Sequence, residues 1–198
     1  MANVASKFGF GGTGLVLPGY PSSSFATGKY IMPALNRMVF NTTGATDFTN
    51  TLIFLPFIVK RATTITAVSF RNAGAADAGD KIRCGVYSSS GGLPSTLLAE
   101  GAEVTIGGAA ATNDVDITDQ NLTPNTLYFG AIVANADVQV LGITSCDPVI
   151  ETPTITLALT TEDTWVYYQS HTYGALPASA TITAYGRSGS PALFLKVA

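Results

Sequence analysis

Aspartates two or three residues apart are the first candidates for chemistry in this 198-residue chain. They form two groups, Asp77 with Asp80, and Asp114 with Asp116 and Asp119. On a strand, Asp114 and Asp116 would face the same side, because successive side chains alternate. Paired carboxylates at a suitable separation hydrolyse glycosidic bonds, and their oxygens also bind calcium. Both groups lie in turn-like sequence, where Asp bonds its own backbone, so we expect neither a catalytic pair nor a metal site.

The only histidine is His171, and a serine triad would need it as the general base. No serine lies in a Gly-x-Ser-x-Gly turn. Cys84 and Cys146 are too far apart in the sequence for any zinc motif. They form either one disulfide or two buried free thiols, and a chain without a secretion signal favours the thiols. The sequence therefore predicts a protein that is not an enzyme and holds no metal.

An aromatic cluster near the carboxyl end is the best candidate for a binding surface. It consists of Trp165, Tyr167, Tyr168, His171 and Tyr173. Alternation along a strand puts Trp165 and Tyr167 on one face, and flat aromatic faces pack against sugar rings. The alternative, which we favour, places Trp165 and one tyrosine in the core and the others at a subunit contact.

One glycine-rich segment, Gly9–Gly14, matches the letters of the dinucleotide fingerprint. That motif works only between a strand and a helix whose amino end meets the pyrophosphate. Here the apolar residues Leu15–Leu17 and then Pro18 follow. We therefore expect no nucleotide and no other cofactor.

The composition excludes several classes of partner. The net charge is −3, and the ten basic residues are scattered, whereas nucleic-acid binding needs a concentrated positive face. The longest apolar run, Leu52–Val59, is too short to cross a bilayer, and Pro56 inside it suits an edge strand or a bulge. Only 12% of the residues are charged, against about 25% in typical domains. Such a surface suits a long-lived assembly, although a secreted or robust free β-sandwich is an alternative.

Period-two alternation is the dominant structural signal. Ile65, Ala67 and Ser69 are predicted to point one way and Val68 and Phe70 the other. Short strands separated by Gly, Pro and Asn turns predict an all-β protein, a jelly-roll-like antiparallel β-sandwich over residues 30–198. The expected strands are 30–41, 51–60, 63–72, 81–88, 102–106, 114–117, 126–134, 139–143, 164–169, 180–186 and 192–197.

Residues 1–29 differ from the rest in being rich in glycine and proline with apolar residues between them. A flexible linker would not carry so many large apolar side chains. We interpret the segment as an extended arm that becomes ordered when it docks on another surface; the alternative is a loop that covers its own domain. The candidate docking residues are Phe8, Phe10, Leu15, Leu17, Tyr20 and Phe25.

A Leu-x-Pro turn at Leu122–Pro124 is followed four residues later by Tyr128. This spacing is typical of a tyrosine corner, in which the phenol bonds back to the backbone at a Greek-key crossing. We expect Tyr128 to have a structural role.

The order of several motifs in residues 50–142 resembles a module common in structural proteins of tailed bacteriophages. That module has an apolar "PF-V" strand, a "T-T-I" strand, an "R-G-I-Y" strand, a "G-L-P-G-T-L-L" turn and an "L-x-P-G-x-Y-W-L-A" strand. The corresponding segments here are Leu52–Val59, Ala62–Val68, Lys81–Tyr87, Gly92–Leu98 and Leu122–Ala131. This chain departs from the pattern at Asn125, where glycine is usual, and at Phe129 and Gly130, where Trp-Leu is usual.

The resemblance implies a non-enzymatic virion protein that is assembled in the bacterial cytoplasm. It implies a fibre or receptor-binding component, with a capsid decoration protein or a free carbohydrate-binding module as alternatives. The implied partners are other virion proteins, further copies of the chain in a trimer by analogy, and a host surface glycan.

Overall fold

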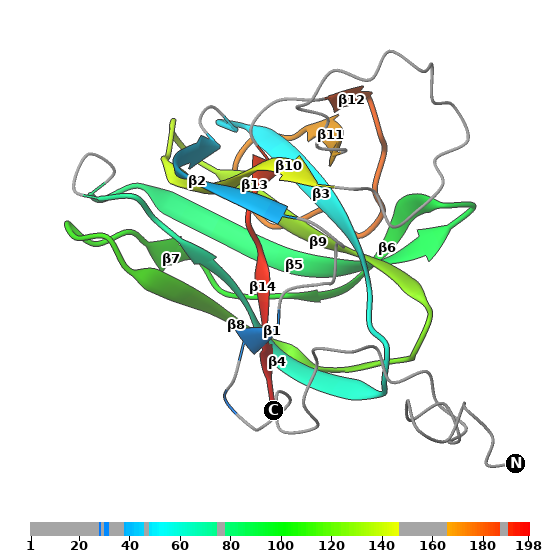
Figure 1. Ribbon diagram of the computed structural model, residues 1–198. Helices are drawn as coiled ribbons and strands as arrows, with labels where there is room; N and C mark the ends of the chain where they lie inside the picture. Colours follow the sequence, from blue (N-terminus) through cyan, green and yellow to red (C-terminus); the bar gives the residue numbers. More distant parts are fainter. Residues whose placement is uncertain are drawn as a thin grey trace, which may run out of the picture.

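The computed structural model describes residues 28, 30–31, 38–45, 48–74, 78–146, 166–186 and 190–198. Within these ranges the chain forms strands, turns and loops and no helix, so none that could cross a membrane. The strands pair antiparallel in two large layers, with a smaller sheet beside them (Figure 1). The prediction of an all-β protein is confirmed.

The first sheet lies low in the view of Figure 1 and has four strands. In spatial order they are β1 (Tyr30–Ile31), β14 (Phe194–Val197), β4 (Thr63–Arg71) and β8 (Thr112–Leu122).

The second sheet packs over the first. In spatial order it holds β12 (Ala184–Gly186), β11 (Val166–Ser170), β3 (Thr51–Ile58), β9 (Leu127–Ala134), β5 (Lys81–Ser90) and β6 (Leu93–Glu100), and β7 (Val104–Thr105) also pairs with β5. The small third sheet holds β13 (Ser190–Pro191), β10 (Val140–Cys146) and β2 (Met38–Ala45).

The strand pairs of the two large sheets are nested along the chain. The innermost pair is β5 with β6, followed outward by β4 with β8, β3 with β9 and β1 with β14. Successive pairs alternate between the two sheets. This is a long antiparallel ribbon wrapped into a sandwich, which is the topology of a jelly roll, and it confirms the predicted fold.

The main core fills the space between the facing sides of these sheets. On β5, Ile82, Cys84 and Val86 point into the core and are fully buried, and the residues between them point outward. Burying alternate side chains in this way is the main source of stability of a two-layer β fold. Pro56 pairs with Phe129 of β9 and lies beyond Phe54, the last β3 residue that pairs with β11 within the described residues. β3 lies between β11 and β9, so Pro56 is not on the edge strand that the sequence suggested.

The predicted alternation of β4 holds for Val68, Ser69 and Phe70 but is wrong at Ile65. Ile65 lies in the core together with Val68 and Phe70, whereas Ser69 bonds to side chains on the outer face. The reason is a register shift between Ile65 and Ala67 against both neighbouring strands. A bulge inserts an extra residue and turns all later side chains to the other face.

Two strands, β6 and β13, were not expected. The expected strand 30–41 includes parts of two strands, β1 and β2, which lie in different sheets, and β12 covers only the end of the expected strand 180–186. Between the expected strands 81–88 and 102–106 the chain makes a two-residue turn at Gly91 and Gly92, whose positive φ values of 60° and 81° suit a tight hairpin. β6 begins directly after it, although no strand was expected there. β8 extends well beyond the predicted 114–117, and β7 is shorter than the predicted 102–106.

Candidate functional site

The outer face of the second sheet carries a second apolar cluster. Leu52 and Phe54 of β3, Tyr87 of β5 and Phe129 of β9 are all fully buried there. The Phe54 and Tyr87 rings meet edge to face at 5.1 Å between centroids. The outer face of an antiparallel sheet is usually polar and wet, so a buried apolar face requires a cover.

The cover is the loop of residues 171–183 between β11 and β12, which we call the strap. Its most buried side chain is Leu176, and Tyr173, Ala180 and Ile182 pack beside it. The two ends of the strap lie together because Thr183 N–H donates to the Tyr168 carbonyl at 2.9 Å. The strap is therefore a closed loop folded flat against the sheet.

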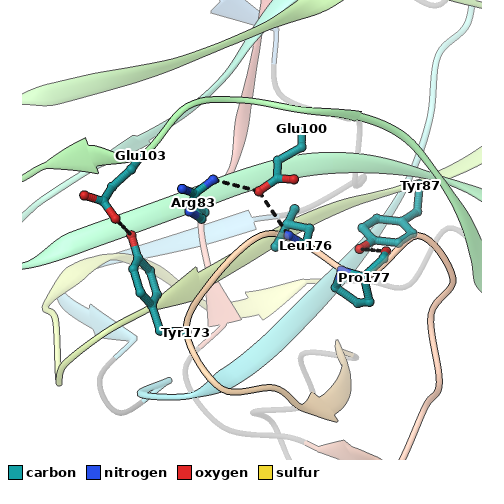
Figure 2. Close-up of polar contacts among 7 residues, drawn as sticks. All are labelled: Arg83, Tyr87, Glu100, Glu103, Tyr173, Leu176 and Pro177. Atoms are coloured by element: carbon teal, nitrogen blue, oxygen red, sulfur yellow. Dashed lines mark hydrogen bonds and ion pairs between the residues drawn. The ribbon is translucent and has the colours of Figure 1, made fainter.

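Two polar contacts hold the middle of the strap against the sheet (Figure 2). The hydroxyl of Tyr87 donates to the Pro177 carbonyl at 2.8 Å. Glu100 accepts through one oxygen from both Arg83 Nη1 and the Leu176 N–H, each at 3.0 Å. These bonds satisfy backbone groups that the apolar contacts would otherwise leave buried and unpaired.

A second set of contacts fixes the start of the strap through Glu103. The Tyr173 hydroxyl donates to Glu103 Oε2 at 3.0 Å (Figure 2), and Lys81 Nζ lies 2.8 Å from Oε1. The hydrogen bond from Lys81, with a further one from Tyr173, holds the pKa of Glu103 below its usual value. Burial, and then the bond to Glu103, raise the pKa of Tyr173.

Hydrogen bonds from strap N–H groups attach the strap at Asn50, just before β3, and at the edge strand β6. Near β3, Asn50 accepts from His171 N–H through its carbonyl and from Tyr173 N–H through Oδ1, at 3.0 and 2.7 Å. At the edge, Ala180 N–H donates to the Ser95 carbonyl of β6 at 2.7 Å. The strap thus covers the face and also occupies part of the β6 edge.

The structure separates the predicted aromatic cluster. Tyr167 packs on the second apolar cluster, edge to face with Phe129 at 5.7 Å. Tyr168 points the other way and packs against the main core. Tyr173 and His171 belong to the strap, and the buried Nε2 atom of His171 has no hydrogen-bond partner. Trp165 lies outside the described residues.

The carboxylate of Asp114 accepts hydrogen bonds from three strands. It takes bonds from Ser69 Oγ and Lys196 Nζ, each at 2.7 Å, and from the Tyr30 hydroxyl at 3.0 and 3.1 Å. Asp116 lies on the same face of β8 but is exposed. Asp114 and Asp116 lie within β8, as the expected strand 114–117 predicts, and Asp119 also lies in this strand instead of in a turn. Asp80 lies in the loop before β5, and Asp77 lies outside the described residues.

Tyr128 makes the backbone contact that its sequence context predicts. Its hydroxyl accepts from the Thr123 N–H, five residues upstream, at 3.0 Å. Its ring stacks on Phe57 with centroids 5.7 Å apart. The bond ties the Leu122–Pro124 turn to the start of β9, which is how a tyrosine corner works.

Cys84 is a buried free thiol, so no disulfide joins it to Cys146. Burial raises the pKa of the Cys84 thiol. In the described ranges no group of three or more His, Cys, Asp or Glu side chains could hold a metal ion. The six candidate arm residues, Phe8 to Phe25, lie outside the described residues.

The contacts that hold the strap were not predicted from the sequence. Arg83 is a charged residue between the buried residues Ile82 and Cys84 of β5, and this position was the available signal in the sequence. Its partner Glu100 is on a strand that was not expected. Comparison with protein-family models, with curated proteins and with solved structures finds no match to this chain.

Proposed function

We propose that the protein is a non-enzymatic structural component of a bacteriophage virion, of the fibre or receptor-binding type. In this proposal the jelly-roll domain projects from the particle, and residues 1–29 attach it. Several copies assemble together, and the exposed part of the domain contacts the host surface.

The proposal rests on one observation, that the carboxylates best placed for chemistry bind other parts of the same chain. Asp114, the best candidate for acid catalysis, is enclosed by Ser69, Lys196 and Tyr30. Glu100 and Glu103 hold the strap. A catalytic carboxylate needs access to a substrate, whereas these groups hold the chain to itself, as in a scaffold.

The motifs that resemble the phage module provide independent support. They lie on β3, β4, β5, the β5–β6 hairpin and β9, which are all strands of the two large sheets of the jelly roll. A glycan site built on Tyr167 and Tyr173 has less support, because both rings pack into the covered apolar cluster.

Complementation of a phage that lacks the gene tests the proposal. The full chain and a variant without residues 2–27 are expressed in the host, and purified particles are assayed for the protein. The shortened variant keeps Gly28, whose N–H donates to the Val197 carbonyl, so its domain is expected to fold. We expect the full chain on the particle and the shortened variant in the soluble fraction.

Three other outcomes are informative. Normal incorporation of the shortened variant would show that residues 2–27 are not the anchor. Absence of the full chain from particles would overturn the virion assignment. Immunogold labelling on the capsid instead of the tail would replace the fibre role with a decoration role.

A further inference from the structure

The first strand of the jelly roll is held by very few backbone contacts. β1 has two residues, Tyr30 and Ile31, which pair with Lys196 and Leu195 of β14. Just before it, Gly28 N–H donates to the Val197 carbonyl at 2.8 Å. A two-residue strand at the edge of a sheet is expected to open readily unless side chains hold it.

The side chain of Tyr30 supplies such a contact across the whole sheet. β1 and β8 are the two outer strands, separated by β14 and β4. The Tyr30 hydroxyl nevertheless reaches both carboxylate oxygens of Asp114 on β8. The ring must therefore extend along the outer face of the sheet, over the strands between.

The other partners of Asp114 come from those intermediate strands. Ser69 on β4 is fully buried and pairs directly with Asp114 in the register, and Lys196 is the β14 residue that pairs with Tyr30. One carboxylate thus bonds to a side chain from each of the three other strands. A lone exposed ion pair contributes little, but a network that converges on one group contributes more.

We propose that Asp114 is a clamp that fixes Gly28, Tyr30 and Ile31 to the sheet and so sets the position from which the N-terminal arm leaves the domain. This inference rests on the proposed function at one point only, namely that the arm anchors the domain to the particle. Opening the clamp would remove the side-chain contact of Tyr30, leaving the two pairings with β14 and the Gly28 bond to resist opening of this segment.

The charges around the carboxylate favour the closed clamp at neutral pH. Burial alone would raise the pKa of Asp114, but the bonds from Lys196, Ser69 and Tyr30 outweigh it and the pKa is lowered. The bond to Asp114 raises the pKa of Lys196. Asp116 also favours the charged form of Lys196. Arg71, two residues after Ser69 on β4, is a further exposed charged residue on this face. Acid that protonates Asp114 is therefore expected to open the clamp.

Amide hydrogen exchange of the isolated full chain tests the clamp directly. The probe is the Gly28 amide, and the Gly101 amide, which bonds the Cys84 carbonyl at 3.1 Å in the other sheet, is the internal reference. We expect Asp114→Asn and Tyr30→Phe each to speed exchange at Gly28 about tenfold relative to Gly101, the effect of losing one charge-assisted bond. Asp116→Asn, the matched control on the same face, is expected to leave the ratio unchanged.

Equal Gly28 protection in wild type, Asp114→Asn and Tyr30→Phe would overturn the clamp. If Asp114→Asn does not fold, Tyr30→Phe alone decides, because it removes one hydroxyl from an exposed ring and leaves the ion pair in place. Incorporation into particles is measured separately. If the variants exchange faster at Gly28 but are incorporated into particles at the normal level, the clamp is supported and the anchoring role of the arm is contradicted.

Discussion

Leu176 lies directly over the backbone of Gly85. A Cβ atom added to Gly85 would be 2.6 Å from Leu176 Cδ1 and 2.7 Å from the Ala99 carbonyl oxygen. The strap therefore fits the sheet at a point where any side chain would prevent its approach. This close contact explains a glycine in the middle of a strand, where it is otherwise unfavourable.

Replacing Gly85 with alanine is expected to lower the free energy of unfolding by about 1–3 kcal/mol, the usual cost of overpacking. Gly108→Ala is the matched control, because nothing lies within 4 Å of its Cβ position, and we expect it to change stability by less than about 0.5 kcal/mol. Denaturant titration measures both. Equal stability of the two variants would contradict the close contact.

A double-mutant cycle separates the two clashes at Gly85. If the strap causes part of the loss, Leu176→Ala and Gly85→Ala together will cost less than the sum of the two single changes. The part that remains comes from the Ala99 carbonyl. Strict additivity would mean that the strap does not press on this position.

The Tyr87 hydroxyl provides a test of the strap that keeps the packing. Tyr87→Phe retains the edge-to-face contact with Phe54 but leaves the Pro177 carbonyl without its donor. We expect a loss of about 1–2 kcal/mol in the free energy of unfolding. Limited proteolysis locates the effect, since cleavage within 171–183 should increase before cleavage elsewhere. Uniform sensitivity along the chain would argue against a local role.

The sequence predicted the strands with a clear apolar pattern, such as β5, where Ile82, Cys84 and Val86 alternate with outward positions, and β9, which is apolar almost throughout. It failed at β6, where Pro94 and the adjacent pair Leu97 and Leu98 break the period. It also failed at Ile65 of β4, because the bulge that turns this side chain into the core depends on both neighbouring strands and leaves no local signal in the sequence.

The site was predicted less well than the fold, for a physical reason. The strap is held by contacts between residues far apart in the chain, such as Tyr173 with Glu103 and Leu176 with Glu100. No spacing rule encodes such pairs. The Tyr128 corner, by contrast, joins residues five apart, and a local pattern was sufficient to find it.

High pH is expected to weaken the strap through its two bonded tyrosines. Burial raises the pKa of Tyr87 and of Tyr173, so folding favours their neutral forms. The stability this gives is fully present below the unfolded-state pKa of about 10 and is lost as the pH rises above it. Unfolding free energies measured from neutral to alkaline pH should decline above about pH 10, and less steeply in Tyr87→Phe. Identical pH profiles would contradict the assignment.

Tyr128→Phe tests the tyrosine corner. The variant keeps the ring that stacks on Phe57 and removes the acceptor of the Thr123 N–H. We expect a loss of about 1 kcal/mol, seen in thermal or denaturant unfolding. Tyr128→Leu, which also removes the stacked ring, should cost more, and an unchanged Tyr128→Phe protein would show that water replaces the hydroxyl.

Tyr167→Ala distinguishes a packing role from a glycan-binding role for the aromatic residues. The ring is partly buried and meets Phe129 edge to face, so its removal leaves a gap in the covered cluster. We expect a loss of about 2–4 kcal/mol in the free energy of unfolding, as for other large-to-small changes in a core. A surface sugar platform predicts the opposite, lost glycan binding with nearly unchanged stability. A glycan array probed with the wild type and the variant, together with denaturant unfolding of both, measures the two effects on the same samples. Because the second apolar cluster needs this ring to close its edge, we expect the stability effect to dominate.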